Sequence, residues 1–281
     1  MANATRVAFQ GEPGAYANLA AREAVPHASA IPKPTFEDAI EAAKTGDTDL
    51  VIIPVENSLI GRIADIHHLL PDSGLHIVGE HFLPIRHQLL GLKDATLEDV
   101  TSVYSQAPAL AQCRNILRER KLVVHNWYDT AGSAKHVADL GDKRVAAIAS
   151  TLAAEFYGLK ILQADVEDEH HNATRFLIMS RQDERAPKAG KVVTSFIFQV
   201  KNAPAALYKA LGAFATNGVN MTKLESYQLG GSFNATQFYA DIQGHPDEPH
   251  VDAALKELEF QTAKMTLMGV YPASPFREDM P

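Results

Sequence analysis

The apolar run LVIIPV, Leu50–Val55, decides the class of fold. Valine and isoleucine favour a strand, and because no alternate position is polar, other parts of the protein must cover both faces of that strand. Comparable runs are RVAFQ, HIVGEHFLPI, SVYS, LVVHN, RVAAIA and RFLIMS, and between them lie helical patterns such as FEDAIEAAKTG, PALAQCRNILRERK and SAKHVADLG. Strands that alternate with helices from Arg6 to Ser180 predict a largely parallel α/β sheet.

A second pattern follows a polar break in the sequence. Residues 181–191, RQDERAPKAGK, contain almost no apolar side chain and are predicted to form a linker. After them come VVTSFIFQV, AALYKALGAFATNG, NMTKLESYQL, NATQFYADIQG, VDAALKELE and KMTLMGVYP, in the order strand, helix, strand, strand, helix, strand. This order predicts a ferredoxin-like βαββαβ module. We therefore expect an α/β domain at 1–180, the linker, and the module at 192–281.

Composition excludes several classes of function. The net charge of −8 argues against nucleic-acid binding, which needs a basic face, and means that an anionic substrate must meet a local positive field. The single cysteine, Cys113, excludes an intrachain disulfide and a cysteine-only zinc site. No apolar run approaches the roughly 20 residues of a membrane span, and we see no signal-peptide pattern. These observations predict a cytoplasmic protein that binds neither nucleic acid nor membrane.

Small and polar residues gather at three predicted junctions that lead into helices. FQGEPGAYAN turns through Gly14 and Ala15, IIPVENSLIGRI passes from Glu56–Ser58 to Gly61, and WYDTAGSAKHVADL begins a helix around Thr130–Ser133. Helix N-termini carry unpaired amides and a partial positive charge, so three such junctions in one domain predict a site for a small anion. Taken alone, the first junction is better explained as a glycine-dependent loop and the second as an ordinary helix cap, so each is a weak signal by itself.

The adjacent histidines His170 and His171 lack the spacing of metal ligands. Neighbouring residues point apart on a strand and about 100° apart on a helix, so we predict exposed side chains and no bound metal. The sequon at residues 172–174 is interpreted as coincidence in a cytoplasmic chain, and Asn172 is expected to shape the turn before Thr174. Cys113 is interpreted as a packed small hydrophobe, although pairing with a histidine distant in sequence stays open.

Six segments together are similar to the motifs of a known enzyme family. GEPGAYAN, PVENSLIGRI, SQAPALAQC, DTAGSA, AAEFYGLKIL and NATRF, in that order, resemble prephenate dehydratase. The C-terminal pattern, with NAPAALYKAL, GVNMTKLESYQ, FYADIQGH and MGVYP, resembles the ACT regulatory domain of that family. The resemblance runs from about Val7 to Pro272. It implies a two-lobed α/β catalytic domain with a cleft like that of periplasmic binding proteins, with lobes at roughly 1–80 plus 170–180 and at 81–169.

The resemblance also implies a reaction. Prephenate would lose its ring hydroxyl and, as carbon dioxide, its ring carboxylate, which gives phenylpyruvate; aromatisation drives this elimination, so no cofactor or metal is expected. The essential threonine of the family corresponds to Thr174, whose hydroxyl would donate to the leaving hydroxyl. Further catalytic or substrate-orienting positions correspond to Glu56, Asn57, Ser105 and Gln112. Carboxylate-binding amides would lie at Gly14, Ala15, Ser58, Gly61, Thr130, Ala131, Gly132 and Ser133, with Arg175 as a cleft anchor or a structural ion pair.

The C-terminal motifs imply a regulatory site. Asn202, Ala205, Ala206, Leu207, Glu225 and Ser226 fall in the two segments that resemble the phenylalanine site between ACT domains of paired subunits. This implies feedback by L-phenylalanine and a homodimer or homotetramer. AAL in place of the usual GAL, and ESYQ in place of ESRP, leave the identity and strength of the effector open. SQAPALAQC also departs from the common SHPQALAQC, while Ser105, Gln112 and Cys113 keep their spacing.

Two alternatives remain beside prephenate dehydratase. Arogenate dehydratases share these motifs and make phenylalanine directly from the aminated substrate, so the choice of substrate stays open. A non-catalytic amino-acid sensor would keep the ACT motifs and the fold, but it would not need Glu56–Ser58 together with Thr174 and Arg175. A solute-binding protein would need an export signal. We therefore expect a carbon–oxygen lyase of L-phenylalanine biosynthesis.

Overall fold

The computed structural model describes residues 4–228 and 235–278. The chain forms two compact units, each assembled from segments that are separated in sequence. Unit 1 contains Met1–Ala42, Val51–Ile63 and Phe82–Phe176, and unit 2 contains Ala43–Leu50, Ala64–His81 and Leu177–Pro281. The predicted boundaries at 180 and 192 stay predictions.

The first sheet of unit 1 contains the fold-deciding run. Its strands are β1 (Arg6–Gln10), β2 (Ser29–Lys33), β3 (Leu50–Asn57) and β11 (Ala173–Ser180), in the order β11-β3-β1-β2, with the short β4 (Gly61–Arg62) paired to β3 and the helices α1 (Tyr16–Ala24) and α2 (Phe36–Thr45) between strands. β1 and β2 are parallel. Val51, Ile52 and Ile53 are fully buried, so the expectation of a strand covered on both faces is confirmed.

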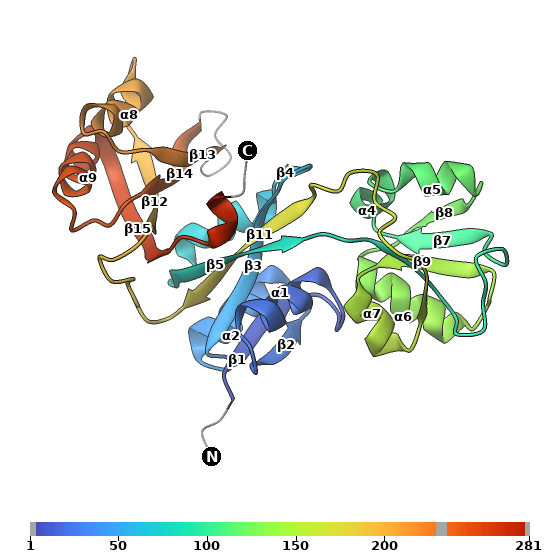
Figure 1. The fold of residues 1–281 in the computed structure, drawn as a ribbon. Coiled ribbons are helices and arrows are strands. Elements are labelled where there is room, and N and C mark those ends of the chain that lie inside the picture. Colours follow the sequence, from blue (N-terminus) through green and yellow to red (C-terminus); the bar gives the residue numbers. More distant parts are fainter. Residues whose placement is uncertain (1–3, 229–234, 279–281) are drawn as a thin grey trace. The chain divides into compact units, whose positions relative to one another are not determined.

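The second sheet of unit 1 has five strands in the order β10-β6-β9-β7-β8. They are β6 (Gln88–Gly91), β7 (Ser102–Ser105), β8 (Val123–Asn126), β9 (Val145–Ala149) and β10 (Lys160–Gln163). Helices α4 (Ala107–Ala111) and α5 (Arg114–Glu119) cover one face, while α6 (Thr130–Leu140) and α7 (Thr151–Tyr157) cover the other (Figure 1). Neighbouring residues such as Leu89 and Leu90 belong to separate apolar clusters, because they point to opposite faces of the sheet.

The direction of the strands differs from the prediction in this second sheet. β7 is parallel to β8 and β9, as expected, but β6 is antiparallel to both β9 and β10. The prediction of a largely parallel sheet is therefore wrong here, and the fold is α/β with mixed sheets. β6 and β10 were not among the predicted strands, and the direction of a strand pair depends on contacts distant in sequence, which periodicity does not show.

The C-terminal part of unit 2 has the predicted ferredoxin-like order. β12 (Val192–Val200), α8 (Ala206–Thr216), β13 (Met221–Gln228), β14 (Ala235–Gln243), α9 (Pro249–Gln261) and β15 (Thr262–Pro272) follow one another, and the strand order is β13-β14-β12-β15. α8 and α9 cover one face (Figure 1), over a core that includes Phe196, Phe198 and Phe214. The predicted βαββαβ fold is confirmed.

This sheet continues to β5 (His76–Pro84), whose Ile77 pairs in parallel with Gly269 of β15. A Cβ at position 269 would overlap the Ile77 carbonyl, so only glycine permits this approach. Beside it, Arg277 in η2 (Pro275–Glu278) binds both carboxylate oxygens of the fully buried Glu80 side chain, at 2.6 and 2.8 Å. This bidentate pair fastens the described C-terminal end to β5.

The connection at residues 181–191 contains no helix or strand. It is nevertheless held to the C-terminal module, because the Ala186 amide donates to the Val270 carbonyl at 2.8 Å and Lys188 donates to the Asp247 carbonyl at 2.7 Å. Before β5, α3 (Ala64–Leu69) and η1 (Leu70–Asp72) complete unit 2. Within 4–228 and 235–278, no helix is both long and apolar enough to cross a membrane.

Candidate active site

Asn57 at the end of β3 and Thr174 near the start of β11 are joined by a hydrogen bond. Asn57 Oδ1 accepts the amides of Leu59 and Ile60, both at 3.0 Å, so its carboxamide nitrogen must face the other way. That nitrogen donates to Thr174 Oγ1 at 3.0 Å and to Asn172 Oδ1 at 2.7 Å. Two residues that are 117 positions apart in the sequence are thus joined through one carboxamide.

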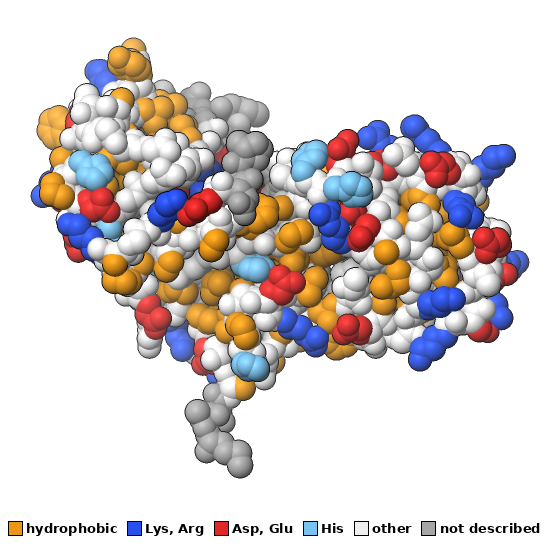
Figure 2. All heavy atoms as spheres, in the orientation of Figure 1, with side chains coloured by type: hydrophobic (Ala, Val, Ile, Leu, Met, Phe, Trp, Pro, Cys, Tyr) orange, Lys and Arg blue, Asp and Glu red, His pale blue; other side chains and the backbone are white. Residues whose placement is uncertain are grey.

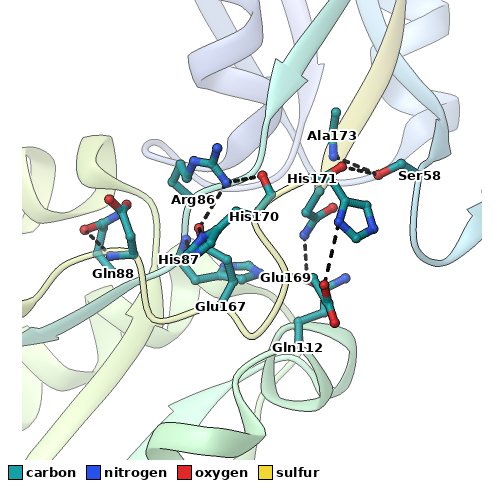
Figure 3. Close-up of polar contacts among 12 residues, drawn as sticks. Ser58, Arg86, His87, Gln88, Gln112, Glu167, Glu169, His170, His171 and Ala173 are labelled. Atoms are coloured by element: carbon teal, nitrogen blue, oxygen red, sulfur yellow. Dashed lines mark hydrogen bonds and ion pairs between the residues drawn. The ribbon is translucent and has the colours of Figure 1, made fainter. Parts of the chain in front are cut away.

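The chain of hydrogen bonds continues from Asn172 to Gln112 at the end of α4 and to His87, just before β6. Asn172 Nδ2 donates to Gln112 Oε1 at 3.0 Å, and His87 Nε2 lies 2.8 Å from the same oxygen. His87 Nδ1 lies 2.7 Å from the hydroxyl of Tyr16 on α1. Figure 3 shows the contacts around Gln112 and His87. We call the series Thr174, Asn57, Asn172, Gln112, His87 and Tyr16 the amide network.

Thr174 is positioned to donate. Its oxygen accepts the hydrogen from Asn57, and in the part of the chain that the structure describes no acceptor for its own hydroxyl hydrogen is present. The side chain is only 8% exposed, so bulk water competes weakly for this hydrogen. A bound molecule that presents an oxygen to Thr174 would therefore receive a hydrogen bond.

Glu56 and Arg175 form an ion pair next to this network. Arg175 Nη1 lies 2.9 Å from Glu56 Oε1, and the guanidinium is 2% exposed and lies 5.9 Å from the centre of the Phe82 ring. Of the two interpretations of Arg175, cleft anchor and structural ion pair, this contact favours the second. A buried guanidinium that lost its carboxylate would be strongly destabilising.

Ser58 and Gly61 also lie close to the network. The Ser58 hydroxyl donates to the His171 carbonyl and accepts the Ala173 amide, both at 3.0 Å (Figure 3), and the Ser58 amide donates to the Ala173 carbonyl at 2.9 Å. Gly61 is exposed, has a φ of 87° and pairs with Asn57 in the β3–β4 hairpin. Ser58 thus fixes the start of β11, just before Thr174.

Three other predicted residues use their polar groups within the fold. Ser105 is fully buried and donates to the Ile148 carbonyl at 2.7 Å. The Gly14 amide donates to the Asn18 side chain at 3.1 Å, and the Ala15 amide donates to the Glu12 carbonyl at 3.0 Å. A substrate carboxylate could reach the last two amides only by displacing these acceptors, and their role in binding stays a prediction.

The start of α6 is occupied by the protein's own carboxylate. Asp129 is the N-cap and accepts a short hydrogen bond from the Gly132 amide, while the Ser133 hydroxyl donates to the Asp129 carbonyl at 2.6 Å. Thr130 and Ala131 follow the cap and are buried. Burial raises the pKa of Asp129 above its usual 3.8, against the opposing effect of the Gly132 amide. The binding of a substrate carboxylate at Thr130–Ser133 also stays a prediction.

Several interpretations of the motif around Thr174 are confirmed. The side chains of His170 and His171 are 75% and 69% exposed, as predicted. Cys113 is fully buried in an apolar cluster and burial raises the pKa of its thiol, which fits a packed hydrophobe. Asn172 does more than shape a turn, because its side chain links Asn57 to Gln112.

Sequence reasoning missed His87, Tyr16, Arg86 and Glu167. Glu167 is 5% exposed; it accepts the His87 amide at 2.8 Å and Arg86 Nη1 at 3.2 Å, and Arg86 also donates to the His170 carbonyl at 2.6 Å (Figure 3). Tyr16 lies inside the GEPGAYAN motif, which was a usable signal. His87 and Glu167 carry no local pattern that marks them.

Basic and acidic side chains are interspersed over the second-sheet part of unit 1 on the face drawn in Figure 2. Individual groups, and not a broad basic surface, must therefore attract an anionic ligand here.

The residues of the predicted effector site lie in unit 2. Asn202 and Ala205 are in the loop before α8, Ala206 and Leu207 begin that helix, and Glu225 and Ser226 are on β13. Ala205 has a φ of 59°, a left-handed conformation that glycine adopts more readily. Lys223 lies 3.3 Å from Glu225. The binding of an effector at these two segments stays a prediction.

The fold and the amide network are those of an α/β enzyme domain joined to a ferredoxin-like module, and comparison with known proteins identifies its family. Residues 7–184 match the family model for prephenate dehydratase. The chain belongs to the prephenate dehydratase family.

Two relatives illustrate the range of activities in this family. The chain is 50% identical over 272 residues to a bifunctional N-acyl-homoserine lactone acylase/prephenate dehydratase of Komagataeibacter europaeus. The aligned region covers 96% of this chain and 97% of the relative. It is 38% identical over 276 residues to arogenate dehydratase/prephenate dehydratase 2, chloroplastic, of Arabidopsis thaliana, which covers 95% of this chain and 72% of that protein.

Solved structures confirm the fold over nearly the full length. A structure described as GqqA, a novel type of quorum quenching acylases, is 49% identical with a TM-score of 0.92, and the match covers 97% of this chain and 99% of that chain. A prephenate dehydratase of Arthrobacter aurescens in complex with L-Phe is 26% identical with a TM-score of 0.88, covering 99% and 92%.

Proposed function

We propose that this chain is a prephenate dehydratase that converts prephenate to phenylpyruvate. In this reaction the ring carboxylate leaves as carbon dioxide, its bonding electrons complete the aromatic ring, and the ring C–O bond breaks to release hydroxide. The hydroxide takes a proton to become water. The observation that carries the proposal is the orientation of Asn57, which leaves the hydroxyl hydrogen of Thr174 available for the departing oxygen.

The network gives each residue a role in this proposal. The Asn57 N–H donates to Thr174 Oγ1, and this bond makes the Thr174 hydroxyl a stronger donor because it withdraws electron density from the oxygen. The carboxamide nitrogen of Gln112 has no acceptor within the described residues, so its two hydrogens would bind a substrate oxygen. Glu56 and Arg175 hold β3 and β11 together beside the reacting groups.

Turnover of the two candidate substrates tests the proposal. Purified protein should convert prephenate to phenylpyruvate, which is detected by its ultraviolet absorbance in alkali, and Thr174→Ala should lose about 10²- to 10⁴-fold in kcat while it keeps the wild-type melting temperature. Ser105→Ala is not a suitable control, because that serine is itself a predicted catalytic residue. Ser274→Ala, in unit 2, is a suitable one. A higher kcat/KM with arogenate than with prephenate would assign the chain to arogenate dehydratases.

We further propose that residues 192–281 are an ACT domain that binds L-phenylalanine and lowers the activity. Two observations support this: the βαββαβ fold, and the similarity to a prephenate dehydratase whose structure was solved in complex with L-Phe. A homodimer or homotetramer and a cytoplasmic location belong to the same proposal. Isothermal titration with L-phenylalanine, beside prephenate turnover with and without it, tests the regulation. An absence of both binding and inhibition would contradict it.

A second candidate activity is hydrolysis of N-acyl-homoserine lactones. It is favoured by the relative of Komagataeibacter europaeus, which is named for both activities. Such an acylase would add water across the acyl amide bond and release a fatty acid and homoserine lactone. Mass spectrometry of a reaction with an N-acyl-homoserine lactone detects both products. If Thr174→Ala abolished both activities, they would share the amide network; if it abolished only prephenate turnover, the acylase would use another site.

A further inference from the structure

Asn57 sets the orientation of the other two carboxamides in the amide network. Asn57 Oδ1 is fixed by the amides of Leu59 and Ile60, because a backbone N–H can only donate. The Asn57 nitrogen therefore donates to Asn172, and the acceptor must be the side-chain oxygen of Asn172, at 2.7 Å. The side-chain nitrogen of Asn172 then donates to Gln112, and the acceptor must be the side-chain oxygen of Gln112, at 3.0 Å. No carboxamide in this series can rotate by half a turn without losing a hydrogen bond.

The same constraint fixes the hydrogen on His87. Its Nε2 lies 2.8 Å from Gln112 Oε1, which offers only lone pairs. A bare Nε2 would place two lone pairs against each other, so Nε2 must carry a hydrogen. The Tyr16 hydroxyl, 2.7 Å from Nδ1 and 2.9 Å from the Arg86 carbonyl, has one hydrogen to give. With a neutral ring Nδ1 is bare, and the one Tyr16 hydrogen is shared between Nδ1, at 2.7 Å, and the Arg86 carbonyl, at 2.9 Å.

Burial keeps this ring neutral. The pKa of His87 is lowered from its usual 6.5, chiefly by burial, while the contact with Gln112 and the charge of Glu167 oppose this. Tyr16 on α1 keeps its hydrogen, because burial, together with Cys113 and Glu167, raises its pKa well above the usual 10.0. These groups, with the Arg86 side chain on Glu167, are the titratable and charged neighbours of the ring.

We propose that His87, neutral and with its hydrogen on Nε2, is a positioning residue for the dehydratase site, held in that tautomer by Gln112 Oε1. By occupying one lone pair of Gln112 Oε1, it stops the Gln112 carboxamide from rotating, so that both hydrogens of the Gln112 nitrogen stay directed away from the network and toward the substrate. Its role in turnover rests on the proposed function, while the tautomer does not. His87 touches no reacting atom in this assignment; it acts through Gln112.

The tautomer is measured without substrate. Protein labelled with ¹⁵N in the histidine rings, compared with His87→Gln to assign the signal, should show for His87 one protonated nitrogen, correlated to both ring carbons as Nε2, and one bare Nδ1. This pattern should hold at pH 7.5 in the wild type. In Tyr16→Phe the acceptor Gln112 Oε1 is unchanged, and the signal of protonated Nε2 should persist. A protonated Nδ1 in the wild type, in either a neutral or a doubly protonated ring, overturns the assignment.

Kinetics test the positioning role with matched variants. His87→Leu removes the donor to Gln112 and should lower kcat/KM for prephenate about 10²-fold, as expected when a reacting group is misplaced by about 1 Å. His87→Gln can return an N–H to the same oxygen and should recover at least tenfold of that loss. His171→Gln, an exposed histidine beside Asn172, is the control and should match the wild type. Melting temperatures verify that all variants fold.

Three outcomes are distinguishable. Equal losses in His87→Leu and His87→Gln, with both folded, would reduce His87 to a packing residue and overturn its positioning role. Wild-type activity in His87→Leu would overturn it too. If the wild type failed to convert prephenate while the ring showed the Nε2–H form, the proposed function would fail and the tautomer would stand.

Discussion

The end of β3 and the start of α6 use their hydrogen-bond donors in opposite ways. At β3, the Asn57 side-chain oxygen accepts two backbone amides and its nitrogen donates to Thr174 Oγ1. The Thr174 hydroxyl hydrogen therefore remains without an acceptor in the described part of the chain. At α6, Asp129 accepts the Gly132 amide, and the Ser133 hydroxyl is bound to a carbonyl. Both segments carry small polar residues in the sequence. What separates a candidate reactive site from a satisfied helix cap is which donors are left after the internal pairing is complete.

The largest expected difference between the two regions comes from exchanging amide and carboxylate. Asn57→Asp keeps the acceptor for Leu59 and Ile60 but removes the donor to Thr174 and Asn172, and it would turn the Thr174 hydrogen toward itself. We expect kcat with prephenate to fall by about 10²- to 10³-fold, the range for loss of one preorganised donor group. Asp129→Asn keeps the acceptor for Gly132, and we expect its kcat to stay within about threefold of wild type, since asparagine and aspartate cap helices equally well.

Steady-state rates of both variants, measured on samples with verified melting curves, check this pair. A large loss in Asp129→Asn together with a small one in Asn57→Asp would reverse the comparison, and would indicate that the α6 start is the reacting region.

Removing a serine hydroxyl gives a smaller contrast. Ser58→Ala deletes two hydrogen bonds that hold the start of β11, and Ser133→Ala deletes one within the helix cap. Each should lower the free energy of unfolding by about 1 kcal/mol per lost bond. Only Ser58→Ala should also reduce kcat, by about tenfold, because the shifted strand carries Thr174. Denaturant unfolding and kinetics on the same preparations separate the two effects, and equal kcat values would refute the link between Ser58 and Thr174.

The smallest effect is on the pH dependence of stability. The raised pKa of Asp129 means that the folded protein binds more protons than the unfolded chain above the usual value of 3.8, so ionisation of Asp129 lowers stability as the pH rises through that window. Asp129→Asn should therefore melt at a higher temperature than wild type at pH 7, and the gap should close near pH 3. His87 has the opposite sign: its lowered pKa makes the fold lose stability as the pH falls below 6.5.

Differential scanning calorimetry across this range detects both trends. A melting-temperature gap for Asp129→Asn that widened toward pH 3 would contradict the assignment of burial as the dominant influence on Asp129.

The sequence predicted the alternation of strands and helices and the ferredoxin-like module, because motifs and periodicity are local properties; the catalytic roles of Thr174, Asn57 and Gln112 stay predictions. It did not predict β2, whose Pro32 disfavours a strand interior and is tolerated at the edge of the sheet. Nor did it find the antiparallel β6, whose pairing with β9 and β10 joins segments distant in sequence.

The site was only partly predictable for a related reason. Asn172 and His87 act through carboxamide and ring orientations that depend on partners 25 to 115 residues away. No sequence pattern encodes which end of an amide faces its neighbour. For the amides of Gly14 and Gly132 the motifs are visible in the sequence, but only the structure shows that Asn18 and Asp129 accept hydrogen bonds from them.

Reliance on three carboxamides also determines how this protein ages. Asparagine and glutamine are among the thermolabile side chains, and hydrolysis turns each into a carboxylate that accepts but no longer donates. Asn57 and Asn172 are followed by the small residues Ser58 and Ala173, but both side chains are buried. The backbone nitrogens that would attack them are also hydrogen-bonded, Ser58 to the Ala173 carbonyl and Ala173 to the Ser58 hydroxyl. The fold therefore protects the carboxamides on which the network depends, and peptide mass mapping of a stored preparation should find deamidation at exposed asparagines before it reaches Asn57 or Asn172.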